Sequence, residues 1–228
     1  EPVDYNRLDI EKLPDYFETA QELGWDVGIH CMGDRAQDVA VDALAAVIEE
    51  IPRPQLRHNI IHGTFPTRQA MELMAEHDIA VVLQPSALYY DSGSYFEHVG
   101  PERMARYKPA RSYTDHGVQV VSSSDMIYTK SANPFVGLYA LATRKNRHGQ
   151  VVGPQEGLTR EEALRSYTSA GAWLTREEGI KGTLALGKLA DMAVLDRDYF
   201  SVPEEEIKEI EVEVTIVGGK IVYEKAAS

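Results

Sequence analysis

Cysteine is almost absent from the sequence, because Cys31 is the only one among 228 residues. No disulfide can form within the chain, which favours a reducing compartment and predicts a cytoplasmic protein. The sequence also lacks an apolar run of about 18 residues that could cross a bilayer. Its first residues show no signal-peptide pattern. Together these absences predict a protein without a membrane partner.

Positive charge is also scarce in this chain. There are 23 Lys and Arg residues against 36 Asp and Glu residues, which gives a formal net charge of -13. Such an excess of negative charge argues against nucleic acid or an anionic membrane as a partner. With 43% hydrophobic and 26% charged residues, the composition is that of an ordinary globular protein. The length suits one large domain, or a domain with a small appendage.

Three short apolar runs each end in a residue that can bind a metal ion. Residues 27–30 end at His30, residues 59–61 run into His62, and residues 118–124 run into Asp125. Continuous apolar runs are typical of buried parallel strands. In a (β/α) barrel the reactive groups lie at the C-terminal ends of such strands. The pattern therefore predicts three strand ends that present metal ligands to one site.

Segments with a helical period alternate with these apolar runs. Apolar residues recur at helical spacing in four segments, and a Thr-Glu capping box at Thr159 and Glu162 opens a fifth. The expected helices are 15–23, 36–50, 67–77, 134–144 and 159–172, and the expected strands are 27–30, 59–62, 79–84 and 118–124. This alternation predicts an α/β fold with parallel strands.

Residues 86–110 interrupt the alternation, since they show no steady period. A stretch this long within a compact domain is expected to be a functional loop or to contain short helices. It holds Tyr89, Tyr90 and Tyr95. These tyrosines either line a substrate pocket or pack in the core, and the sequence favours neither.

The pattern changes again near residue 180. Beyond it, residues 183–196 and 211–224 have the composition of short β segments, separated by Gly-Lys, Asp and Gly-Gly turns. We therefore expect a domain boundary near residue 180, with one domain over residues 1–180 and a small β domain over residues 181–228.

Several of these motifs resemble those of a known family. Residues 29–36, Ile-His-Cys-Met-Gly-Asp-Arg-Ala, resemble the His-Ala-x-Gly-Asp-Arg-Ala signature of the YtcJ-like branch of the amidohydrolase superfamily. That branch includes N-substituted formamide deformylase. Residues 60–63 resemble its Ile-Glu-His-Ala motif and residues 123–125 its Gly-Ser-Asp motif. Residues 182–196 and 217–223 are similar to the usual C-terminal runs of the superfamily, so the resemblance covers nearly the whole chain.

The resemblance implies a fold and also shows what the chain lacks. The family fold is a metal-dependent (β/α)8 TIM barrel with a small β-sandwich built from both chain ends. Its first metal ligands come from a His-x-His motif, which does not occur in this sequence. Only four barrel strands are expected here, whereas a complete barrel takes about 250 residues. We therefore expect the C-terminal half of the barrel, strands five to eight, followed by the C-terminal part of the β-sandwich.

The resemblance also implies a chemistry. His30 and His62 are then neutral imidazole ligands of a divalent metal, with zinc the first choice and one or two ions in the site. Asp125 is a further ligand and the general base. The metal lowers the pKa of a bound water toward ~7, and the carboxylate passes a proton to the departing nitrogen. In a one-metal site His62 instead holds the hydroxide or the substrate oxygen.

Each candidate residue also has a structural interpretation. A histidine that closes an apolar run is more often a hydrogen-bonded core residue than a metal ligand. Asp34 either contacts the substrate or caps the helix that follows. Arg35 either binds a carboxylate or carbonyl of the substrate or forms a structural ion pair. Cys31 is expected to be a small core residue.

The resemblance thus implies that this chain is the C-terminal portion of a hydrolase, whose full-length form acts on carbon–nitrogen bonds of a small amide or cyclic amide. Two alternatives stay open. The first is a non-catalytic half barrel that covers its open sheet edges by forming a homo-oligomer or by pairing with a missing N-terminal half. The second is a regulatory or binding protein that has kept the fold and lost the chemistry.

Overall fold

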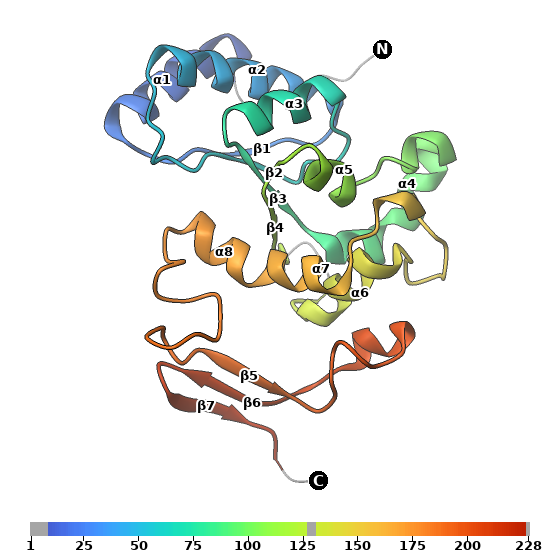
Figure 1. Cartoon of the computed structure of the whole chain (residues 1–228). Coiled ribbons are helices and arrows are strands. Elements are labelled where there is room, and N and C mark those ends of the chain that lie inside the picture. Colours follow the sequence, from blue (N-terminus) through green and yellow to red (C-terminus); the bar gives the residue numbers. More distant parts are fainter. Residues whose placement is uncertain (1–8, 127–130, 227–228) are drawn as a thin grey trace. The chain divides into compact units, whose positions relative to one another are not determined.

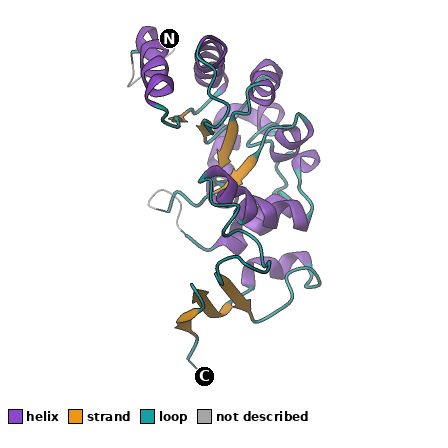
Figure 2. Ribbon diagram, turned by 60° about the vertical axis from the view of Figure 1, so that its left-hand side comes forward, coloured by secondary structure: helices purple, strands orange, loops and turns teal. Residues whose placement is uncertain are grey.

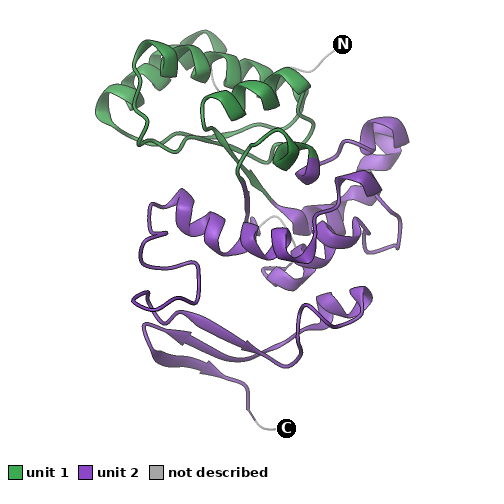
Figure 3. Cartoon of the chain, viewed as in Figure 1, with its two compact units in different colours: residues 1–83, 112–119 green, residues 84–111, 120–228 purple. Residues whose placement is uncertain are grey.

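The computed structural model describes residues 9–126 and 131–226. The chain divides into two compact units (Figure 3): unit 1 is residues 1–83 and 112–119, and unit 2 is residues 84–111 and 120–228. The boundary predicted near residue 180 falls inside unit 2, and the two domains expected on either side of it stay a prediction. Among the described residues, no helix is long and apolar enough to cross a membrane.

Three parallel strands form the sheet of unit 1. They are β1 (Gly28–His30), β2 (Asn59–Ile61) and β3 (Ala80–Leu83), with β2 in the middle. Ile29 pairs with Ile60, and Ile60 pairs with Val81, so one row of buried aliphatic side chains crosses the sheet. The predicted α/β fold with parallel strands is confirmed. Each strand is one or two residues shorter than the strand expected from the sequence.

Three helices of unit 1 lie side by side (Figures 1 and 2): α1 (Leu13–Leu23), α2 (Asp34–Glu50) and α3 (Arg68–Glu76). A 3-10 turn, η1 (Ile10–Lys12), precedes α1. The apolar stripe expected on α2 is buried, with Ala40, Val41 and Leu44 almost inaccessible to solvent. The three helices predicted over residues 15–23, 36–50 and 67–77 are confirmed. They were predictable because the apolar residues of each helix follow the helical period.

Unit 2 begins with a helix where no helical period was found. The stretch expected to be a functional loop or to contain short helices is α4 (Pro85–Met104), which is helical on both sides of a break at Gly100, where φ is 76°. Its buried residues include Ser86 and Ser92 besides Leu88. Because polar and apolar side chains share the buried face, no apolar period marks this helix. A short helix, α5 (Ala110–Asp115), follows, and its residues 112–115 belong to unit 1.

The rest of unit 2 before residue 180 is mainly helical. It contains β4 (Val120–Ser122), α6 (Pro134–Thr143), η2 (Pro154–Glu156), α7 (Arg160–Tyr167) and α8 (Ser169–Leu174). The capping box of Thr159 and Glu162 is confirmed. The single helix expected over 159–172 is wrong, because the backbone at Thr168 (φ -123°, ψ -89°) leaves the helical region and separates α7 from α8.

The chain ends in a second sheet of three antiparallel strands in the order β5-β6-β7. They are β5 (Met192–Leu195), β6 (Val212–Val217) and β7 (Lys220–Glu224), and η3 (Glu204–Glu209) lies between β5 and β6. The β segment expected over 183–196 is thus a strand only in its last part. The segment expected over 211–224 is a hairpin that turns at Gly218 and Gly219, both with positive φ, as a tight hairpin requires.

Candidate functional site

Two histidines meet at adjacent strand ends of unit 1. His30 is the last residue of β1, and His62 follows the last residue of β2. Nδ1 of His30 lies 2.9 Å from Nε2 of His62, a hydrogen bond whose donor depends on the tautomers. The ring centroids are 4.4 Å apart and the rings are nearly perpendicular. The parallel pairing of β1 with β2 therefore brings together two of the three predicted ligands.

The backbone at His62 is strained. Its φ is 81°, which is rare for a residue with a side chain. Conformations of this kind cost about 1–3 kcal/mol and persist only where the surroundings enforce them. The N–H of His62 donates to the carbonyl of Val82 at 2.9 Å, which ties the strained residue to the neighbouring strand. Such strain gathers at functional sites, so it supports a role for His62 beyond packing.

The two nitrogens suit a divalent metal. Zinc–imidazole bonds are 2.0–2.1 Å long, so two ligand nitrogens of a tetrahedral site lie about 3.3 Å apart. The two imidazole nitrogens, which are 2.9 Å apart, would have to move only slightly apart to reach this distance. Within the part of the chain that the structure describes, neither unit holds a cluster of three or more His, Cys, Asp or Glu side chains that could bind a metal. Unit 1 thus brings together two imidazole nitrogens that could hold a metal ion.

Cys31, Asp34 and Arg35 follow His30 closely in the sequence. Cys31 is buried, and burial raises its pKa to about 12, so its thiol stays protonated and is a core group as expected. Gly33, not Asp34, occupies the N-cap position of α2. Asp34 is the first helical residue, and its carboxylate accepts the N–H of Arg35 at 2.9 Å. The Arg35 side chain is exposed, and substrate contacts of Asp34 and Arg35 stay a prediction.

Asp125, the third predicted ligand and base, belongs to unit 2. It lies three residues beyond the end of β4, is exposed, and has a left-handed backbone with φ 49°. The strand expected over 118–124 is therefore shorter, and Asp125 lies in the loop that follows it. Its convergence with His30 and His62 stays a prediction.

A buried lysine near this loop was missed by the sequence analysis. The ammonium of Lys108, whose side chain is buried, donates to Oε1 of Gln84 at 3.1 Å, and Nε2 of Gln84 donates to Oγ of Ser123 at 3.2 Å. Burial lowers the pKa of Lys108 to about 7, while the negative charges of Asp125 and Asp91 act in the opposite direction. Buried groups with such shifted pKa values gather at functional sites.

The backbone around Lys108 is held by another buried cation. The guanidinium of Arg144 donates to the carbonyls of Tyr107, Lys108 and Val152 at 2.6, 3.0 and 2.9 Å. Gln84 carried a usable sequence signal, because it ends an apolar strand as His30 and His62 do. Lys108 carried none, since it lies just beyond a helix with no apolar period.

Comparison with known proteins identifies the family. The model of the amidohydrolase family matches residues 3–223, so the chain belongs to that family, which confirms the resemblance of its motifs. It is 29% identical over 222 residues to YtcJ of Bacillus subtilis (strain 168), a protein whose name places it among the amidohydrolases. It is 31% identical over 231 residues to the N-substituted formamide deformylase of Arthrobacter pascens.

The chain is much shorter than these relatives. The two alignments cover 96% and 99% of this chain but 41% and 42% of the relatives. Among solved structures, a metal-dependent hydrolase from Pyrococcus horikoshii OT3 is similar, with a TM-score of 0.72 and 27% identity. That match covers 87% of this chain and 39% of the other. The likeness thus extends over nearly all of this chain and about two-fifths of each of the three proteins.

Proposed function

We propose that this chain supplies part of the active site of a metal-dependent hydrolase that cleaves carbon–nitrogen bonds of small amide or cyclic amide substrates. The observation that carries the proposal is the pair of imidazole nitrogens, 2.9 Å apart, at the ends of two adjacent parallel strands. Membership of the amidohydrolase family supports the reaction class. The name of the formamide deformylase supports an amide-type substrate.

In this proposal His30 and His62 hold the metal through neutral imidazole nitrogens. A divalent ion, with zinc the first choice, supplies a Lewis acid and an acidified water when it is bound. Asp125 is the further ligand and the general base, which accepts the proton of the water and returns it to the departing nitrogen. Arg35 and Asp34, which follow β1, contact the polar groups of the substrate.

We also propose that β1, β2, β3 and β4 are strands five to eight of a (β/α)8 barrel and that β5–β7 belong to a small β-sandwich. Within the described residues no strand pairs with the outer edge of β1, where Gly28 and His30 are exposed. An open strand edge recruits another strand. The relatives are more than twice as long as this chain, which fits a site completed by further barrel strands.

Hydrolysis of N-substituted formamides tests the proposal. The zinc-loaded chain is assayed alone and with the other half of the barrel supplied as a separate polypeptide. We expect turnover only in the mixture, and we expect Asp125→Asn to abolish it while the circular dichroism spectrum is unchanged. Asp15→Asn, an exposed aspartate of α1, is the matched control and keeps full activity. Full activity of Asp125→Asn would remove Asp125 as the base.

A further inference from the structure

The turn that presents His62 is left-handed at two successive residues. φ is 81° at His62 and 49° at Gly63. The second residue has no side chain, and a Cβ built there lies 2.5 Å from Cγ2 of Val81 and 2.6 Å from the hydroxyl oxygen of Tyr113. The turn is therefore pressed against two buried side chains. The contacts that hold Gly63 in place therefore also hold the backbone from which the His62 imidazole projects.

One buried polar side chain contacts this turn, and a second one contacts the first. The hydroxyl of Tyr113 donates to the carbonyl of Gly63 at 3.2 Å, and Nε2 of Gln37 donates to the Tyr113 oxygen at 2.8 Å. Both side chains are inaccessible to solvent. Burial also raises the pKa of Tyr113, so its hydroxyl keeps the proton that the Gly63 carbonyl accepts.

These contacts join segments that are far apart in the sequence. Gln37 lies on α2, Gly63 follows β2, and Tyr113 lies on α5. The turn is also tied to β3, because the N–H of His62 donates to the carbonyl of Val82. The strained turn is thus held by hydrogen bonds to α5 and to β3, which are the contacts that a strained conformation needs in order to persist.

We infer that Tyr113 and Gln37 are positioning residues, which act through the Gly63 carbonyl to aim the imidazole of His62 at His30. The inference rests on the proposed role of the two histidines as metal ligands. Groups that orient metal ligands without touching the metal alter metal affinity by about 10- to 100-fold when they are removed. Tyr113 and Gln37 then belong to the site even though they lie beneath it.

Cobalt(II) is a suitable probe, since its absorption spectrum reports the ligand geometry. In the full chain we expect Tyr113→Phe and, separately, Gln37→Met to weaken Co2+ binding about 10- to 100-fold and to change the absorption bands. The matched control is Gln21→Leu. Gln21 is a buried amide of the same unit that donates to Ile51 and is hydrogen-bonded to His58, away from the turn. We expect it to lower stability and to leave Co2+ binding unchanged.

Equal effects of Tyr113→Phe and Gln21→Leu on Co2+ affinity would overturn the inference, because the role of Tyr113 would then be structural only. Imidazole nitrogen chemical shifts of the metal-free chain separate the two proposals. If the wild-type chain binds no Co2+ even when the other half of the barrel is supplied, the proposed function fails. The inference is then supported if Tyr113→Phe changes the His62 shifts and Gln21→Leu does not. It is contradicted if Tyr113→Phe leaves these shifts unchanged.

Discussion

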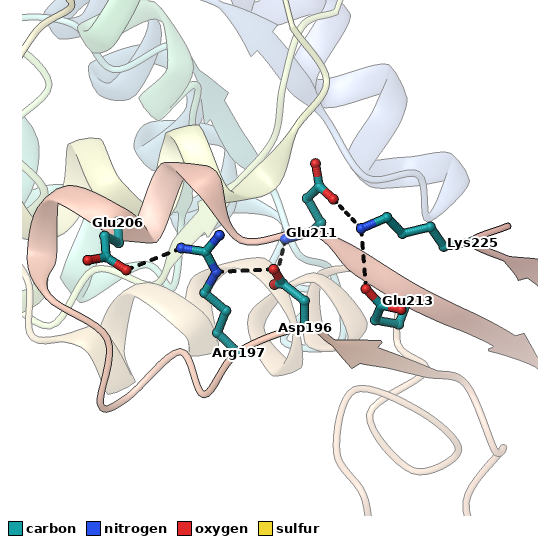
Figure 4. Close-up of polar contacts among 6 residues, drawn as sticks. All are labelled: Asp196, Arg197, Glu206, Glu211, Glu213 and Lys225. Carbon is teal, nitrogen blue, oxygen red and sulfur yellow. Dashed lines mark hydrogen bonds and ion pairs between the residues drawn. The ribbon is translucent and has the colours of Figure 1, made fainter. Parts of the chain in front are cut away.

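The polar contacts behind His62 differ in kind from those of the C-terminal sheet. In unit 1, Gln37, Tyr113 and the Gly63 carbonyl are uncharged and buried. In the C-terminal sheet, charged side chains form the contacts in Figure 4: Lys225 pairs with Glu211 and Glu213, and Arg197 pairs with Asp196 and Glu206. Most of these side chains are a third or more exposed.

This difference indicates which polar contacts determine the local geometry of the fold. Breaking a buried hydrogen bond leaves a polar group without a partner in a medium of low dielectric constant, which costs about 1–3 kcal/mol. An exposed ion pair competes with water and salt and contributes at most about 1 kcal/mol. The contacts around the His62 turn therefore determine local geometry, whereas the ion pairs of the C-terminal sheet are largely replaceable.

Gly63→Ala, in the buried region behind His62, should cause the largest loss in the free energy of unfolding. A left-handed alanine costs about 1–2 kcal/mol, and the clash of its Cβ with Val81 and Tyr113 adds about 1–3 kcal/mol. The matched control is Gly24→Ala, at φ 71° with no atom within 4 Å of its Cβ, which should cost only the first amount. Urea unfolding measures both variants, and equal losses would contradict the tight fit at Gly63.

Lys108→Met tests a third kind of contact, which is both charged and buried. Since burial lowers the Lys108 pKa to about 7 from 10.5, the unfolded chain binds more protons than the folded chain between these pH values. The free energy of unfolding of the wild type should therefore rise with pH across this window, relative to the variant, by on the order of a few kcal/mol. Parallel pH profiles of wild type and variant would contradict a lowered Lys108 pKa.

Glu162→Gln tests a half-buried ion pair, which lies between the two extremes. The pKa of Glu162 is lowered to about 2 from 4.5, mainly by its hydrogen bonds with Arg111 and to a smaller extent by those with Thr159. The pair therefore stabilises the fold above about pH 4.5, and this contribution is lost as the pH falls toward about 2. Gln can keep the capping box, so the variant should be about 1–2 kcal/mol less stable at neutral pH only. A difference that persists at low pH would argue against the ion pair.

Lys225→Met should have the smallest effect. Lys225 bridges Glu211 and Glu213 on the exposed side of the C-terminal sheet. We expect almost no change in the urea midpoint, and any change should vanish in added salt, because salt screens exposed charges. A large loss that is insensitive to salt would mean that exposed and buried contacts do not differ as described.

The sequence predicted the parts of the fold that repeat a regular pattern. β1, β2 and β3 were predictable because buried parallel strands are apolar throughout, and α1 to α3 because one face of each helix is apolar. α4 was not predictable in this way, since Ser86 and Ser92 share its buried face with Leu88. The break at Thr168 was missed because the residues around it keep a helical spacing.

The candidate site divides in the same way. The approach of His30 and His62 followed from the geometry of parallel strand ends. Tyr113 and Gln37 were missed because no local pattern shows that residues on α5 and α2 meet behind the turn after β2. Lys108 was missed for the same reason, since its burial arises from tertiary packing and not from its neighbours in the sequence.

X-ray absorption at the zinc edge tests most directly whether His30 and His62 together hold a metal ion. The zinc-loaded chain should show imidazole nitrogens at about 2.0–2.1 Å from the metal. His30→Ala and His62→Ala should each remove one imidazole from the spectrum, whereas His77→Ala, a histidine at the end of α3, should leave it unchanged. A spectrum without imidazole scattering, or one that is the same in all three variants, would contradict the account.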